Sequence, residues 1–71
     1  KDIYAKIFAE MIKNGTMKKD DPEMLAFTYT APITALLHLC DREPEREQEI
    51  VGEIEAFVRH FVEVYGKKEA N

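Results

Sequence analysis

The stretch from Met24 to Cys40 constrains the fold of this chain more than any other feature, because its 17 residues include no Asp, Glu, Lys or Arg. A helix without charge on any side is typical of a buried helix. Turned as a helix, the stretch has one side of mostly bulky residues, such as Leu25, and one of mostly small residues, such as Ala31. Both sides therefore need cover from neighbouring helices.

A membrane span is the rival explanation for this stretch. Its length lies at the lower limit of the roughly 17–25 residues that a spanning helix needs. It also contains Pro32, His38 and three threonines, and acidic residues follow it at once. Membrane-spanning helices are usually more apolar than this. We therefore predict a buried helix and no membrane partner.

The apolar spacing predicts three helices, over residues 2–14, 21–40 and 45–65. Gly15 stands where helices commonly end in a left-handed residue, and the short connector after it should fold Met17 back onto the first helix. Asp21 is placed to cap the second helix. Pro32 lies inside that helix and predicts either a kink or a split into two helices.

The ends of the third helix are also marked in the sequence. The residue before a proline avoids helical geometry, so Asp41–Pro44 reads as a tight turn between the second and third helices. Gly66 is the expected stop of the third helix, and residues 67–71 are expected to form a frayed tail.

A chain of 71 residues holds one domain at most and buries only about 60% of its unfolded surface, so its stability alone is marginal. Its one cysteine, Cys40, excludes an intrachain disulfide and suits a reducing cytoplasm. Cys40, His38 and His60 match no common zinc spacing, so we expect neither a metal site nor a cofactor. Association with other helices is the remaining route to stability.

Two classes of function are disfavoured. No activated nucleophile, paired acid and base, or phosphate-binding loop is present, so we expect no enzymatic activity. The net charge of −4 argues against nucleic-acid binding by this segment, since phosphate contacts need clustered Lys and Arg. The chain begins with Lys1 and enters an amphipathic pattern without a cap, so we expect it to be part of a longer protein.

Several residues together carry a family resemblance. A helix ending at Gly15 is followed by a short basic connector, Asp21-Pro22-Glu23, the run Tyr29-Thr30-Ala31-Pro32-Ile33, a turn through Pro44, and a closing helix that ends in Phe61–Gly66. With these features the chain resembles the C-terminal portion of tetracycline-repressor (TetR) family regulators. The resemblance covers nearly the whole segment.

The resemblance implies an all-α, three-helix fragment whose long antiparallel hairpin forms a four-helix-bundle interface in a homodimer. Residues 1–66 would be the ligand-binding and dimerisation region. Operator DNA would be bound only by an N-terminal helix-turn-helix domain that this chain lacks. The residues that the resemblance places at the dimer interface are Ala31, Ala35, His38, Ile54, Phe57, Val58 and Phe61. Those that it places in one wall of the pocket for a small hydrophobic effector are Phe8, Met11, Ile12, Met24, Phe27 and Thr28.

The expected function is thus that of a ligand-responsive, cytoplasmic transcriptional regulator, with repression as the expected mode. The alternative is a free-standing helical module that binds another protein. The length of chain upstream separates the two, because the regulator requires a basic helix-turn-helix pattern there.

Overall fold

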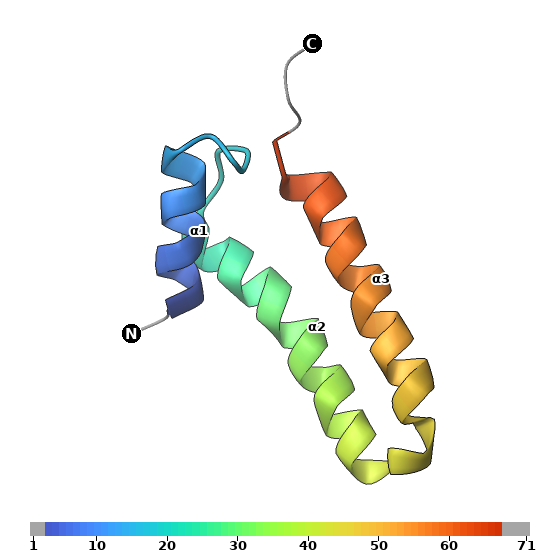
Figure 1. Ribbon diagram of the computed structural model, residues 1–71. Helices are drawn as coiled ribbons and strands as arrows, with labels where there is room; N and C mark the ends of the chain where they lie inside the picture. The colour runs from blue at the N-terminus through green and yellow to red at the C-terminus, as the bar shows by residue number, and fades with distance from the viewer. Residues whose placement is uncertain (1–2, 68–71) are drawn as a thin grey trace.

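The computed structural model describes residues 3–67, which fold into three helices (Figure 1). They are α1 (Ile3–Lys13), α2 (Pro22–Arg42) and α3 (Glu47–Tyr65), with a 3₁₀ turn over Pro44–Arg46. The helices α2 and α3 form an antiparallel hairpin, and α1 lies beside the N-terminal half of α2. The predicted all-α class is confirmed, since the described range contains no strand beyond an isolated bridge.

The end of α1 confirms the predicted left-handed stop. Gly15 has φ +87°, the N–H of Thr16 donates to the carbonyl of Met11 at 2.8 Å, and the N–H of Gly15 donates to that of Ile12 at 3.2 Å. This pair of bonds is the Schellman arrangement, which satisfies the last carbonyls of a helix. The chain then reverses and buries Met17 against the core, as the sequence predicted.

Substituting Gly15 tests this stop directly. Gly15→Ala is expected to lower the free energy of unfolding by about 1–2 kcal/mol, because a Cβ is unfavourable at positive φ. The added methyl would meet nothing within 4 Å, so the backbone conformation alone sets the loss. Gly15→Asn is the matched control and should lose less, since Asn tolerates this conformation better. Urea denaturation at one protein concentration measures both, and an equal loss in the two variants would contradict this reasoning.

The start of α2 confirms the predicted cap. The Asp21 carboxylate accepts a hydrogen bond from the N–H of Glu23 at 3.0 Å. Such a cap satisfies one of the N–H groups that a helix leaves unpaired at its first turn. The helix then continues through Pro32 to Arg42, so the predicted alternative of two separate helices is wrong. Proline has no N–H for the carbonyl of Thr28 one turn earlier, yet the helix is maintained on both sides of it.

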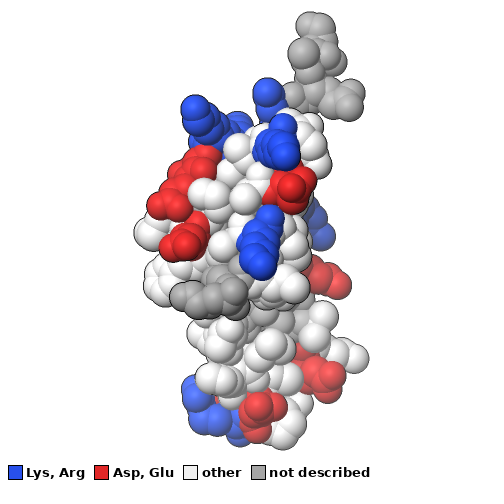
Figure 2. Space-filling view, turned by 90° about the vertical axis from the view of Figure 1, so that its left-hand side faces the viewer, with Lys and Arg blue, Asp and Glu red and all other residues white. Residues whose placement is uncertain are grey.

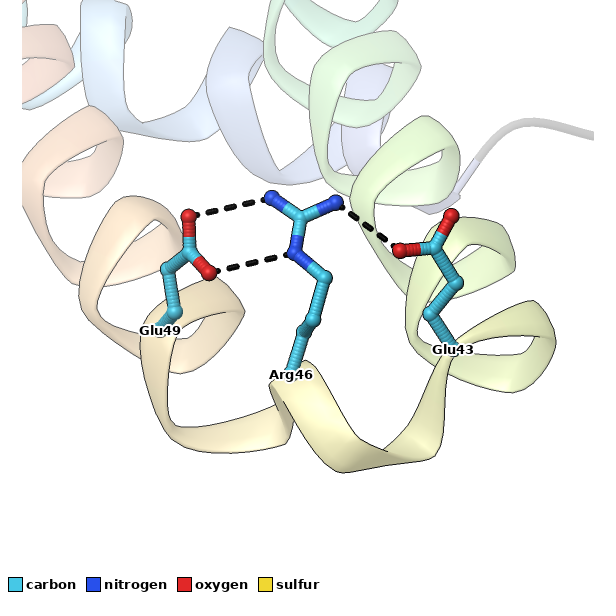
Figure 3. A network of polar contacts seen from close by, with 3 residues as sticks. All are labelled: Glu43, Arg46 and Glu49. Carbon is cyan, nitrogen blue, oxygen red and sulfur yellow. Dashed lines mark hydrogen bonds and ion pairs between the residues drawn. The ribbon is translucent and has the colours of Figure 1, made fainter.

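At the tip of the hairpin, α2 ends two residues later than predicted, and Glu43 adopts the extended φ of −134° that a residue before proline favours. Arg46 then joins the two helices (Figure 3). Its guanidinium donates to both carboxylate oxygens of Glu49, at 3.0 and 3.1 Å, and to Glu43 at 3.1 Å. These hydrogen bonds raise the pKa of Arg46 and lower the pKa of Glu49.

The opposite end of the hairpin is closed by backbone pairing between the connector after α1 and the residues after α3. The N–H of Lys18 donates to the carbonyl of Tyr65, and the N–H of Lys67 donates to that of Thr16, both at 2.9 Å. Lys67 therefore belongs to this bridge rather than to a frayed tail. Residues 68–71, the rest of the predicted tail, lie outside the described residues.

Gly66 ends α3 as predicted, but by a different means from Gly15. Its φ of −70° and ψ of 147° are extended, so no left-handed residue is involved. A Cβ at Gly66 would lie 2.5 Å from the carbonyl oxygen of Val62. Glycine is therefore required here for close approach of the backbone to the last turn of α3.

The core is small and lies where the three helices come closest. The buried residues that form it are Phe8, Met17, Leu25, Ala26 and Phe61. The Cα atoms extend over 42 × 33 × 12 Å, so the three helices form a flat assembly. This flat arrangement leaves large apolar side chains uncovered, among them Phe27 and Val62.

Candidate functional site

An apolar groove of about 560 Å³ lies between α1 and α3. Its α1 wall is formed by Tyr4, Ile7 and Met11, and its α3 wall by Val58 and Val62. At one end it is bordered by Glu63 and by the backbone bridge that joins the connector after α1 to the residues after α3. Its size falls within the ~300–1,000 Å³ range of small-molecule sites, and its walls are mainly apolar, as is usual for such sites.

The floor of the groove is aromatic. The ring centroids of Tyr29 and Phe61 are 5.0 Å apart, and Phe8 lies 5.7 Å from each of them. Edge-to-face and tilted pairs at these distances stabilise a core beyond the area that they bury. The floor is therefore set by the packing of the three helices on one another and exists before anything enters the groove.

A second uncovered surface is the side of α2 that faces away from the core. Phe27 is 64% exposed, and Ala31, Ala35 and His38 are exposed along the same side. Figure 2 looks at the side of the molecule that carries α1, and it shows charged residues above and below a middle region that is mostly uncharged. The uncovered α2 surface is the small-residue side of the Met24–Cys40 stretch, whereas the bulky side, which includes Leu25, packs inward. Cover was expected on both sides, and within the described residues only the bulky side has it.

The six residues predicted for the pocket wall do not come together in one place. Phe8 and Met11 line the groove. Ile12 packs against the core cluster and Thr28 is half-buried in α2, outside the groove lining. Met24 and Phe27 are exposed on α2, on the side opposite to buried Leu25 and Ala26. The resemblance assigned all six residues to one wall. Met24 and Phe27 cannot belong to it in this structure, because they lie on the side of α2 that faces away from α1.

The residues predicted for the dimer interface also occupy different environments. Ala31, Ala35 and His38 are exposed, whereas Ile54, Phe57 and Val58 are half-buried. Phe61 is only 3% exposed and packs on Phe8, Tyr29 and Tyr65 within the chain. A partner helix has no access to the Phe61 ring in this arrangement.

Several groove residues were not singled out from the sequence, namely Tyr4, Ile7, Tyr29 and Val62. Tyr4 and Ile7 share the apolar spacing of Phe8 and Met11, so the helical period was a signal for them. Tyr29 was named in the run that carries the family resemblance, but nothing in the sequence assigned it to a pocket. No local pattern shows that Val62 faces α1, because that proximity is set by how the connector returns the chain to α3.

Among residues 3–67, no three His, Cys, Asp or Glu side chains are grouped so that they could hold a metal ion. None of the helices in that range is both long and apolar enough to cross a membrane. Comparison with known proteins finds no matching protein-family model, no similar curated protein and no similar solved structure.

Proposed function

We propose that this chain is the association segment of a cytoplasmic, ligand-responsive transcriptional regulator, as its resemblance to TetR-family C-terminal regions implies. It contributes a dimer interface and one wall of an effector pocket. DNA binding and repression belong to a part of the protein outside this segment. The observation that carries the proposal is the amount of apolar surface left open by three helices, namely the uncharged α2 surface and the apolar groove between α1 and α3.

Self-association is favoured by the apolar side chains that the chain leaves exposed. Large apolar side chains such as Phe27 and Val62 remain mostly exposed, and each fully buried side chain of this kind contributes about 1.5–3 kcal/mol. The core that the chain forms alone is small, as expected for a domain of this size. A second hairpin packed on the first would bury these side chains and complete a four-helix bundle.

The groove supports the proposal that this chain forms one wall of an effector pocket. Its aromatic floor and aliphatic walls suit a small hydrophobic molecule, and Glu63 at its border offers a polar group for orientation. Because α1 and α3 form opposite walls, a molecule bound there would fix the position of α1 relative to the hairpin. By favouring one position of α1, a bound effector would shift the regulator toward the conformation that binds it best.

A charged substitution on the uncharged α2 surface tests the proposal. Ala35→Glu is expected to weaken self-association by about tenfold or more, because it places an unpaired charge in a desolvated contact. Ala35 is exposed in the single chain, so the fold is retained. Ala9→Glu, at an exposed position of α1, is the matched control and should associate as the unmodified chain does. Sedimentation equilibrium over a range of concentrations measures both.

The association state of the unmodified chain is measured before that of the variants. If it remains a folded monomer at high concentration, self-association is refuted, and binding to a different protein's helices takes its place as the explanation of the uncovered surfaces. If it associates but Ala35→Glu and Ala9→Glu behave alike, the α2 surface is not part of the contact.

A further inference from the structure

The side of α3 that borders the groove carries an exposed apolar stripe. Val51 is 44% exposed, Val62 is 60% exposed, and Val58 between them is half-buried. With Glu55 these residues are separated by steps of four, three and four residues. Alternating steps of three and four are the spacing of a seam between two packed helices. The stripe therefore has the pattern of a helix contact, and no helix of the described chain covers it.

Charged residues accompany this stripe. A shallow depression on α3 is lined by Ile54, Glu55, Val58, Arg59, Val62 and Glu63. Glu55 and Arg59 lie one turn apart on the exposed side of α3. Neither forms an ion pair with any residue in the range 3–67. Both charges are thus available to a partner that presents the opposite signs in the reverse order.

A second copy of this chain is such a partner. We infer that α3 packs antiparallel on α3 of a second copy, with the two-fold axis at the level of Phe57. In this register Glu55 lies opposite Arg59 of the second copy, and the same pair forms again on the other side of the axis. The inference rests on the self-association proposed above, and it adds α3 to the α2 contact together with the direction and register of the α3 pair.

The apolar stripe supports the same register independently of the charges. With the axis at Phe57, Val51 is level with Val62 of the second copy to within one residue, about 1.5 Å along the helix. Val58 lies about 3 Å along the axis from its own counterpart. The apolar residues and the ion pair therefore share one centre, so the same packing buries the valines and joins the opposite charges.

The competing register is less favourable. Pairing Arg59 with Glu63 of the second copy would move the axis to the level of Phe61. Val51 would then lie opposite a position beyond the end of α3 and lose its apolar partner. That register preserves an ion pair at the cost of part of the apolar contact, whereas the Phe57 register satisfies both.

Charge reversal tests the register. Glu55→Arg gives a chain with two positive charges at the contact, and Arg59→Glu gives a chain with two negative charges. Each variant alone is expected to self-associate about tenfold more weakly, because like charges then lie opposite one another. Mixed together, the two variants should form a heterodimer about as tight as the unmodified dimer. Fluorescence anisotropy of one labelled chain, titrated with the other, measures this recovery.

The mixing experiment separates the intermolecular pair from effects within one helix. Any loss of helix stability from a single reversal would persist in the mixture, so only the opposed arrangement produces recovery. The double variant Glu55→Arg with Arg59→Glu should also self-associate normally. Glu53→Arg, at an exposed position of α3 that lines neither the groove nor the depression, is the control and should leave association unchanged. A weakening by Glu63→Arg that Glu55→Arg does not share would instead favour the Phe61 register.

The outcomes distinguish this inference from the proposal on which it rests. If the unmodified chain associates but neither single reversal weakens it, the α3 register is wrong and self-association stands. If the single reversals weaken association and their mixture fails to recover it, the charges act within one chain and the register is again wrong. If the unmodified chain does not associate, both the proposed self-association and the α3 register are refuted.

Discussion

Replacing Phe61 with alanine is expected to destabilise the chain more than any other single truncation of an aromatic side chain. Phe61 is buried at the junction of all three helices, with ring centroids 5.0 Å from Tyr29 and 4.7 Å from Tyr65. Removing a buried Phe costs about 3–5 kcal/mol, because transfer energy is lost and a cavity remains. Natural stability is only about 0.05–0.15 kcal/mol per residue, so a chain of 71 residues loses a large part of its total.

The adjacent position provides the control for this result. Val62 is 60% exposed, so Val62→Ala should change the free energy of unfolding by no more than about 0.5 kcal/mol in the dissociated chain. Urea denaturation at low protein concentration, followed by circular dichroism, compares the two. Similar midpoints for both variants would show that Phe61 is not part of the core. A charge at position 61 would unfold the chain in the same way, so that substitution reports on folding rather than on association.

The second large effect is expected at Leu25, which anchors the start of α2 in the core. Leu25 is 2% exposed and lies in the cluster with Phe8 and Met17. Leu25→Ala is expected to cost about 2–5 kcal/mol, the range for truncating a buried leucine. Because Phe8 is on α1 and Met17 is in the connector, the cavity should loosen the contact of α1 with the hairpin as well as the global fold.

Met24 provides a control one residue away. It is 56% exposed, so Met24→Ala should have little effect on the unfolding of the dissociated chain. Hydrogen exchange measures where the loss occurs, since amides of α1 should lose protection first in Leu25→Ala. Equal destabilisation by the two substitutions would mean that the orientation of α2 differs from the one described.

Features determined by local chemistry could be predicted from the sequence. Gly15 and Asp21 mark helix ends because a left-handed stop and a side-chain cap depend on the residues beside them. The bulky and small sides of α2 were separated by helical period alone, and the structure places Leu25 inside and Ala31 outside. The return of Met17 to the core was predictable because the connector is too short to lead elsewhere.

Features that depend on how distant segments meet could not be predicted. The resemblance assigned Phe61 to an interface, but its burial follows from the position of α1, which no spacing within α3 reveals. Phe27 was assigned to a pocket wall, and it faces away because α1 packs on the opposite side of α2. Arg46 was not singled out, since its pairing with Glu43 and Glu49 requires the 3₁₀ turn after Pro44.

The backbone bridge after α1 also has a mechanical consequence. Its hydrogen bonds hold one end of the hairpin together, and the ion pairs of Arg46 hold the other. The helices α2 and α3 are therefore linked at both ends of their shared length. Links at both ends oppose sliding of α2 along α3 and separation of the two helices. The two backbone hydrogen bonds of the bridge depend on no side chain, so a substitution at Thr16 leaves the spacing between the helices unchanged. A substitution at Lys18 removes only the added bond from its Nζ to the carbonyl of Val64.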